Sequence, residues 1–148
     1  MLMRLGMILA LLCAAACQTL PKIEVLPPLS HPITVQVSEA HGGLWQHSLL
    51  MIVPQTDQQW RFIQVDALGA PLARQTLQQG QWANNGFLPP NRQASVLFSA
   101  VYAYLAKEKG WPLPDGLQQV TIVPLPNGEA VEIHWQQQSW RIKELADE

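Results

Sequence analysis

The chain has 148 residues, a net charge of −2 at pH 7 and only 14% charged residues. It therefore lacks the basic excess that attracts nucleic acid or anionic lipid head groups, and nucleic acid is not an expected partner. Its two cysteines, Cys13 and Cys17, stand close to the N-terminus, so the rest of the chain has no disulfide and no cysteine metal cluster.

The first seventeen residues have the layout of a secretory signal. Arg4 supplies a basic start, residues 5–12 form an apolar run, and three alanines precede Cys17. The run is too short to span a bilayer as a permanent helix. A cysteine after small residues resembles the lipobox of bacterial lipoproteins, where a peptidase cuts before a lipid-modified cysteine. Ala14 stands where the lipobox usually has leucine, and the alternative is a secreted protein with an incidental cysteine.

The lipobox resemblance implies a processing and a location. We expect residues 1–16 to be removed as a lipoprotein signal peptide and Cys17 to be the site of lipid attachment, carrying acyl chains such as palmitate. In enteric bacteria an aspartate after the lipidated cysteine retains a lipoprotein in the inner membrane. Gln18 follows here, which predicts a lipid anchor in the outer membrane with the protein facing the periplasm.

Residues 17–32 contain four prolines, which fix the backbone in extended conformations. This pattern predicts a lipidated, Pro-rich tether, which at ~3 Å per residue would reach about 45 Å from the membrane. An equally good interpretation is that residues 23–29 lie along the domain as an extended edge.

Five strands are predicted before a helix, at residues 33–37, 44–53, 59–67, 72–78 and 81–83. Residues 49–53 are apolar at every position, and the strand at 59–67 has apolar side chains on both faces. Since one face of an antiparallel sheet is often solvated, these runs indicate that something covers the second face as well.

One helix is predicted over residues 91–109. Asn91 can accept a backbone N–H bond as N-cap, Lys107 and Lys109 suit the C-terminal end of the helix dipole, and Gly110 can end the helix. Its apolar stripe consists of Ala94, Leu97, Phe98, Val101 and Leu105. No charged residue occurs between Arg92 and Lys107, so the helix is expected to be enclosed.

Three more strands are expected at residues 117–123, 129–135 and 139–143, with a hairpin turn at Asn127 and Gly128 and a frayed tail over 145–148. The pattern predicts one α+β domain at residues 33–148. It would be a curved, mostly antiparallel sheet of seven or so strands, with one enclosed apolar helix inserted late in the chain.

From residue 48 to Ile133 the chain resembles a family of proteobacterial lipoproteins related to the LolA/LolB lipoprotein carriers. The resemblance is carried by the run from Val65 to Gly69, by Leu88-Pro89-Pro90, by the helix, and by Gly110-Trp111-Pro112. It implies a LolB-like half-barrel with the helix on its concave side and an apolar cavity for acyl chains. The protruding apolar loop of LolB-type proteins has no evident counterpart, because its candidate, residues 67–69, is small.

Motifs for catalysis and metal binding are not evident. The histidines, His31, His41, His47 and His134, lack the spacing of a metal site, and no serine stands in a nucleophile-elbow motif. We therefore expect no enzymatic activity, no metal and no cofactor.

The expected function is that of an outer-membrane lipoprotein that binds or hands over an acyl-chain ligand, a lipid or lipoprotein, without catalysis. Spare apolar surface on a small domain indicates a pocket or a partner. The expected cavity residues are Trp45, Leu49, Met51, Trp60, Phe62, Phe98, Val101 and Leu105. The alternative is an envelope adaptor that docks a protein partner through the same surface and binds no lipid.

Overall fold

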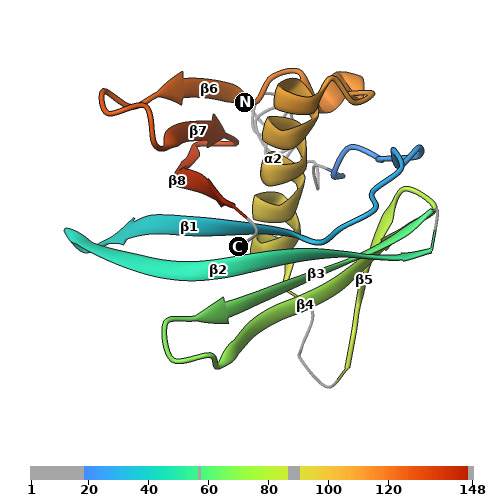
Figure 1. The fold of residues 1–148 in the computed structure, drawn as a ribbon, viewed down its shortest axis with the longest axis horizontal. Coiled ribbons are helices and arrows are strands. Elements are labelled where there is room, and N and C mark those ends of the chain that lie inside the picture. The colour runs from blue at the N-terminus through green and yellow to red at the C-terminus, as the bar shows by residue number, and fades with distance from the viewer. Residues whose placement is uncertain (1–18, 57, 87–90, 147–148) are drawn as a thin grey trace, which may run out of the picture.

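The computed structural model describes residues 19–56, 58–86 and 91–146. The predicted signal, the lipid-attachment residue Cys17 and the Pro89-Pro90 break lie outside the described residues. The described chain forms one eight-stranded antiparallel sheet with one α-helix packed on its concave side (Figure 1).

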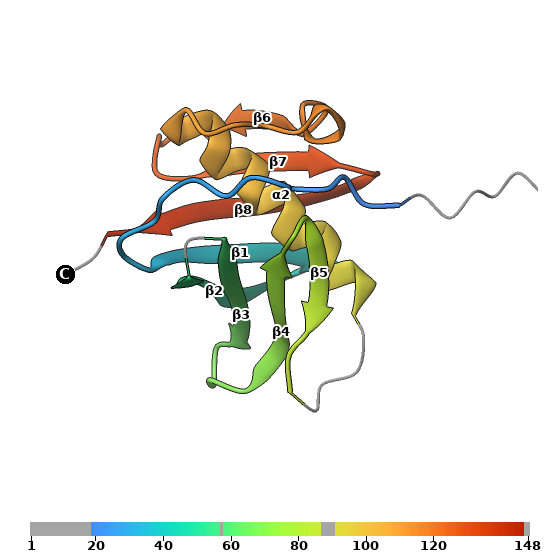
Figure 2. The same cartoon turned by 90° about the vertical axis from the view of Figure 1, so that its right-hand side faces the viewer.

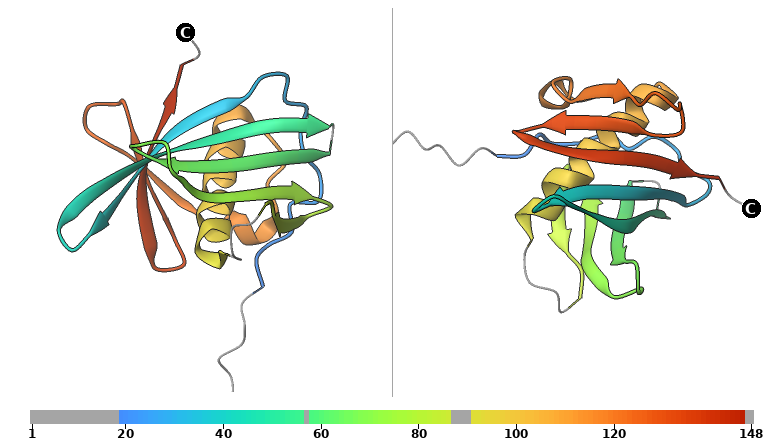
Figure 3. Two further views of the ribbon diagram at one scale, coloured as in Figure 1. Left: turned by 90° about the horizontal axis from the view of Figure 1, so that it is seen from below. Right: turned by 90° about the vertical axis from the view of Figure 1, so that its left-hand side faces the viewer.

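The strands run in the sheet order β5-β4-β3-β2-β1-β8-β7-β6. Their bounds are β1 Ile33–His41, β2 Leu44–Thr56, β3 Gln59–Asp66, β4 Pro71–Gln78, β5 Gln81–Asn84, β6 Thr121–Pro124, β7 Val131–Trp135 and β8 Gln138–Leu145. Strand β1 thus joins a meander of five strands to a C-terminal meander of three. Strands β5 and β6 remain at the two edges, so the sheet is curved and unclosed, and its strong twist is visible in Figure 3. The predicted α+β class is confirmed.

Two predicted boundaries were wrong near the C-terminus. Strand β6 begins at Thr121 rather than at residue 117, because Asp115–Leu117 forms a 3-10 helix, η1, and Leu117 is fully buried. Leu145 does not fray, because it lies opposite Thr34 in the ladder that joins β8 to β1. Backbone pairing with the central strand holds this end of the chain in the sheet.

Helix α2 covers Arg92–Lys109, as the cap residues predict. The Asn91 side-chain oxygen accepts from the backbone N–H of Ala94 at 3.0 Å, and Gly110 ends the helix in the left-handed conformation with a φ of 70°. All residues from 94 to 106 are buried. The helix is therefore enclosed on all sides over this stretch, as the absence of charge indicates.

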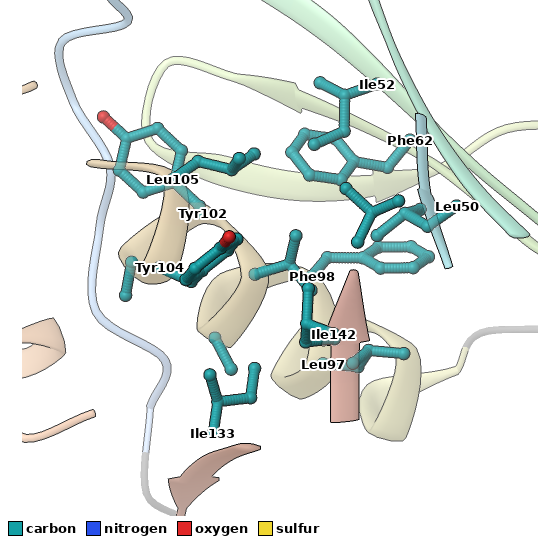
Figure 4. Packing of buried hydrophobic residues seen from close by; sticks show 14 of the residues in the cluster. Leu50, Ile52, Phe62, Leu97, Phe98, Tyr102, Tyr104, Leu105, Ile133 and Ile142 are labelled. Atoms are coloured by element: carbon teal, nitrogen blue, oxygen red, sulfur yellow. The ribbon is translucent and has the colours of Figure 1, made fainter. Parts of the chain in front are cut away.

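The core lies between the helix and the concave face of the sheet (Figure 4). Alternate residues of the central strands point to this face and are buried, as expected for a period of two. They include Ile33, Val35 and Val37 of β1, Leu50 and Ile52 of β2, Phe62 of β3, Ile133 of β7 and Ile142 of β8. Each fully buried large apolar side chain contributes about 1.5–3 kcal/mol.

Residues 19–32, which we call the strap, lie along the domain rather than standing off from it (Figure 2). Ile23 pairs with Gly80 in an isolated β-bridge and is 1% exposed. The backbone N–H of Leu26 donates to the Gln58 side chain, and the Gln58 amide donates back to the Leu26 carbonyl, both at 3.3 Å. Of the two arrangements open from the sequence, the structure shows the packed one.

A buried tyrosine makes the stability of this fold decrease at alkaline pH. Burial raises the pKa of Tyr102 to about 12, and its hydroxyl donates to the Pro112 carbonyl oxygen at 3.2 Å. In the unfolded chain a solvated tyrosine has its ordinary pKa of 10.0. The folded state thus resists ionisation between about pH 10 and 12, and stability that is complete below pH 10 is lost as the pH rises through this window.

We expect wild-type protein to lose about 2 kcal/mol of unfolding free energy through Tyr102 over this window. In Tyr102→Phe this part of the loss should vanish. The loss due to Tyr104, whose pKa is also raised by burial and then by Glu108 and Glu144, should remain. Urea unfolding at pH 9, 10, 11 and 12 measures the difference, and equal pH dependence of the two proteins would contradict the prediction.

Candidate functional site

Five of the eight expected cavity residues lie together on the concave side of the sheet. Phe62, Phe98, Val101 and Leu105 are each 0% exposed, and Trp60 is 1% exposed. The rings of Phe62 and Phe98 stack with centroids 5.4 Å apart. These side chains pack against one another between β3 and α2 and form part of the core (Figure 4).

The other three expected cavity residues, Trp45, Leu49 and Met51, lie on the opposite, convex face of the sheet. Leu50 and Ile52 of the same strand are 0% exposed, whereas Leu49 is 38% exposed. Because side chains alternate along a strand, a run that is apolar at every position places half of its residues outward. Trp45 is 44% exposed and lies under the Arg141 guanidinium, 4.1 Å from the ring centroid.

Two tryptophans outside the expected set complete the aromatic interior. Trp82 meets Phe62 edge to face with centroids 4.7 Å apart, and its indole N–H donates to the Ser99 hydroxyl at 3.1 Å. Trp111 lies edge to face with Trp60 at 5.5 Å. Edge-to-face packing of this kind fills space closely. The space between helix and sheet is therefore occupied by side chains at these positions.

A hollow of about 650 Å³, which we call the strap pocket, lies between the strap and the end of the β2–β3 hairpin and has both apolar and polar side chains in its wall. Its lining residues are Leu26, Pro28, Leu29, Ser30, Pro54, Gln55, Thr56, Gln58 and Trp60. None of these residues, all from the described ranges 19–56 and 58–86, is charged. Trp60 is thus the one expected cavity residue that lines this pocket.

A second hollow of about 630 Å³ adjoins the same strap residues. It shares Pro28, Leu29 and Ser30 with the strap pocket and adds the ion pair between Lys109 and Glu144, with 3.0 Å between Nζ and Oε1. Leu29 thus lines both hollows, and the second has a charged rim. A ligand with an apolar chain and a polar head could place its chain in the first hollow and its head near the ion pair of the second.

Sequence reasoning missed the strap residues of this site. The signal that could have found them is the presence of apolar side chains, Ile23, Leu26 and Leu29, between prolines that keep the backbone extended. A solvated tether has no need of such residues. Which of them is buried depends on the loops that the strap crosses, so the pattern by itself does not locate the pocket.

Metal-ligating side chains do not cluster in the described part of the chain. Residues 19–56, 58–86 and 91–146 contain no group of three or more His, Cys, Asp or Glu residues placed to hold a metal ion. Three histidines each have a polar neighbour: His41 with Glu39 at 3.2 Å, His134 with Glu132 at 3.0 Å, and His47 with Ser38 at 2.7 Å.

Among the described residues, no helix has the length and apolar character required to cross a bilayer.

Comparisons of the chain with protein-family models, with curated proteins and with solved structures gave no match. The likeness to the LolA/LolB carriers therefore depends on the sequence motifs given above, and the function has to be argued from the site.

Proposed function

We propose that this protein is a lipid-anchored, non-catalytic acyl-chain-binding protein of the outer membrane, facing the periplasm, with a LolB-like half-barrel. The observation that carries the proposal is the strap pocket, a hollow of about 650 Å³ between Leu29 and Trp60 whose described lining residues carry no charge. Pockets that hold small ligands usually measure about 300–1,000 Å³ and have mostly apolar walls. The dimensions and chemistry of the hollow suit a hydrocarbon chain.

The proposal places the ligand under the strap instead of in the middle of the half-barrel. Val101 and Phe98, at the centre of the expected cavity, are fully enclosed by core side chains. A ligand there would have to displace well-packed groups, which costs several kcal/mol. The strap pocket is open to solvent on one side and requires no such displacement.

Two hydrogen bonds hold the strap beside the pocket. Gln58 holds Leu26 through two hydrogen bonds of 3.3 Å, at the long end of the normal range. Both hollows adjoin residues 28–30.

A binding experiment with matched variants tests this function. The chain from Gln18 onward, exported behind a cleavable secretory signal, avoids the need for detergent. We expect a fluorescent fatty acid to bind the wild type and not to bind Leu29→Glu. In this variant the ligand would have to remove water from a carboxylate on the pocket wall, which costs free energy. Leu68→Glu is the control, since Leu68 is 94% exposed in the β3–β4 turn.

Native mass spectrometry of the wild-type protein from cells complements this measurement. Acyl species should co-purify with the wild type and with Leu68→Glu, and be absent from Leu29→Glu. If the folded wild type does not bind the probe and carries no acyl species after purification, the carrier function is ruled out.

A second candidate function, docking of an envelope protein, is favoured by the convex face. Leu49 and Leu72 are 38% and 46% exposed there, and Arg61 and Arg74 lie on the same face of β3 and β4. The partner would present an apolar strip bordered by carboxylates. Leu49→Glu should then abolish a site-specific cross-link from Leu72 to that partner while acyl binding persists; an unchanged cross-link would exclude this face.

A further inference from the structure

The packing of the strap limits the distance between the described domain and a lipid anchor at Cys17. The described chain begins at Thr19, two residues after Cys17, and a residue spans at most about 3.6 Å. The domain end that carries Thr19, which we call the anchor end, therefore lies within about 7 Å of the lipidated residue. This inference rests on the proposed lipid anchor.

The strap packs closely on the domain at its N-terminal end, beginning at Pro21. A Cβ atom added at Gly116 would come 2.6 Å from the Pro21 ring, so the ring lies directly on the η1 backbone. At Gly80 an added Cβ would come 3.2 Å from the Lys22 side chain. The two glycines permit an approach that larger residues would prevent, and Ile23 is buried just beyond. The strap here is part of the domain surface and does not serve as a spacer.

The surface around Thr19 combines amides and two cations with apolar side chains, among them Leu20, Pro21 and Trp82. One hollow joins Thr19 and Pro21 to Gln119 and to the β7–β8 turn at Gln136 and Gln137. A second hollow extends from Thr19 across Lys22, Gln81, Trp82, Asn91 and Arg92. The residues that line these two hollows include no aspartate or glutamate.

These groups match the chemistry of phospholipid head groups. Amide N–H groups and cations donate hydrogen bonds to phosphate oxygens, and lysine and arginine are attracted to anionic lipid at short range. The lining of these two hollows contains no carboxylate, and two carboxylates stand beside it, with Glu24 next to Gly80 and Asp115 before Gly116.

We propose that the anchor end lies directly against the head groups of the bilayer that holds Cys17, and that the strap pocket consequently opens away from that bilayer. Figure 2 shows the strap crossing the domain from the anchor end, beside the β7–β8 turn, to the opposite side, where residues 28–32 lead into β1. The anchored protein thus presents its ligand site to the aqueous phase. An acyl ligand would enter from the periplasm and not from the membrane below.

The cysteine content of the chain allows a clean test. In the proposed lipoprotein Cys13 leaves with the signal and the lipid blocks the Cys17 thiol, so one added cysteine carries the only free thiol. Gln119→Cys and Gln81→Cys place a fluorescent label at the exposed anchor end, and Ser30→Cys places it at the exposed far end of the strap. Each acylated full-length protein is incorporated into vesicles of phosphatidylethanolamine and phosphatidylglycerol that contain lipid with a quenching head group.

We expect strong quenching at residues 119 and 81 and little at residue 30. An insert of about ten Gly and Ser residues between Gln18 and Thr19 has a coil length of about 17 Å and should abolish the difference between the sites. If acylated protein without the insert is quenched equally at all three sites, the proposed orientation is wrong. The proposal of a lipid anchor is unaffected by that result. Protein that mass spectrometry shows to be unacylated overturns both the anchor and the orientation that depends on it.

Discussion

Val101→Glu is expected to unfold the domain at neutral pH. Val101 is 0% exposed in the middle of α2, within a stretch of thirteen consecutive buried residues. A carboxylate there finds no water and no cation in the core, and burying an unpaired charge is among the few changes that cost more than about 4 kcal/mol. This is a large part of the roughly 5–15 kcal/mol that stabilises a typical domain. Circular dichroism with urea unfolding measures the loss.

Gln93→Glu is the matched control, since it adds the same charge to the same helix at an exposed position. Residue 93 lies in the first turn, where the helix dipole favours an anion, so its effect should stay within about 0.5 kcal/mol. Desolvation favours the neutral acid, so the loss in Val101→Glu should be smaller at acid pH. A folded Val101→Glu protein with wild-type stability would show that the interior holds a solvated cavity and not a packed core.

Cys17→Ser is expected to abolish membrane attachment. The lipobox-like sequence makes the Cys17 thiol the proposed acceptor of a diacylglyceryl group, which it would hold through a thioether, and a serine cannot form that thioether. Each buried methylene of an acyl chain contributes about 0.8 kcal/mol, so two or three chains hold a protein firmly to a bilayer. Fractionation followed by mass spectrometry should find the serine variant as an unprocessed precursor or as unlipidated protein, and never as a mature membrane-bound form.

Cys13→Ser is the matched control for this variant. Residue 13 belongs to the segment expected to be removed, so its substitution should change neither the mature mass nor the membrane fraction. Loss of attachment in both variants would point to a general failure of export. A mature Cys17→Ser protein that stays fully membrane-bound would contradict the lipid anchor.

Local patterns predicted most elements because short-range physics defines them. Asn91 and Gly110 mark the ends of α2 through a side-chain cap and a left-handed residue, both of which depend on neighbouring backbone alone. Asn127 and Gly128 likewise mark the turn before β7. The boundary of β6 was less predictable, since η1 depends on the burial of Leu117 by more distant parts of the chain.

The candidate site was predicted less well than the fold. The apolar run at residues 49–53 indicated that both faces of β2 carry apolar side chains, which is what the structure shows. It could not indicate which half faces the helix. Pairing with β1 decided this, because Val35 lies opposite Leu50, and the two side chains share the concave face and are both 0% exposed.

The sequence by itself determined the α+β class, the position of the single enclosed helix and the presence of more apolar surface than one helix covers, because periodicity and composition are properties of contiguous residues. Only the tertiary structure decided that the Pro-rich segment packs as a strap and where its pocket lies. Ile23 and Leu26 are held by Gly80 and Gln58, residues far along the chain. Prolines make a segment extended whether it crosses solvent or protein, and long-range contacts alone distinguish the two cases.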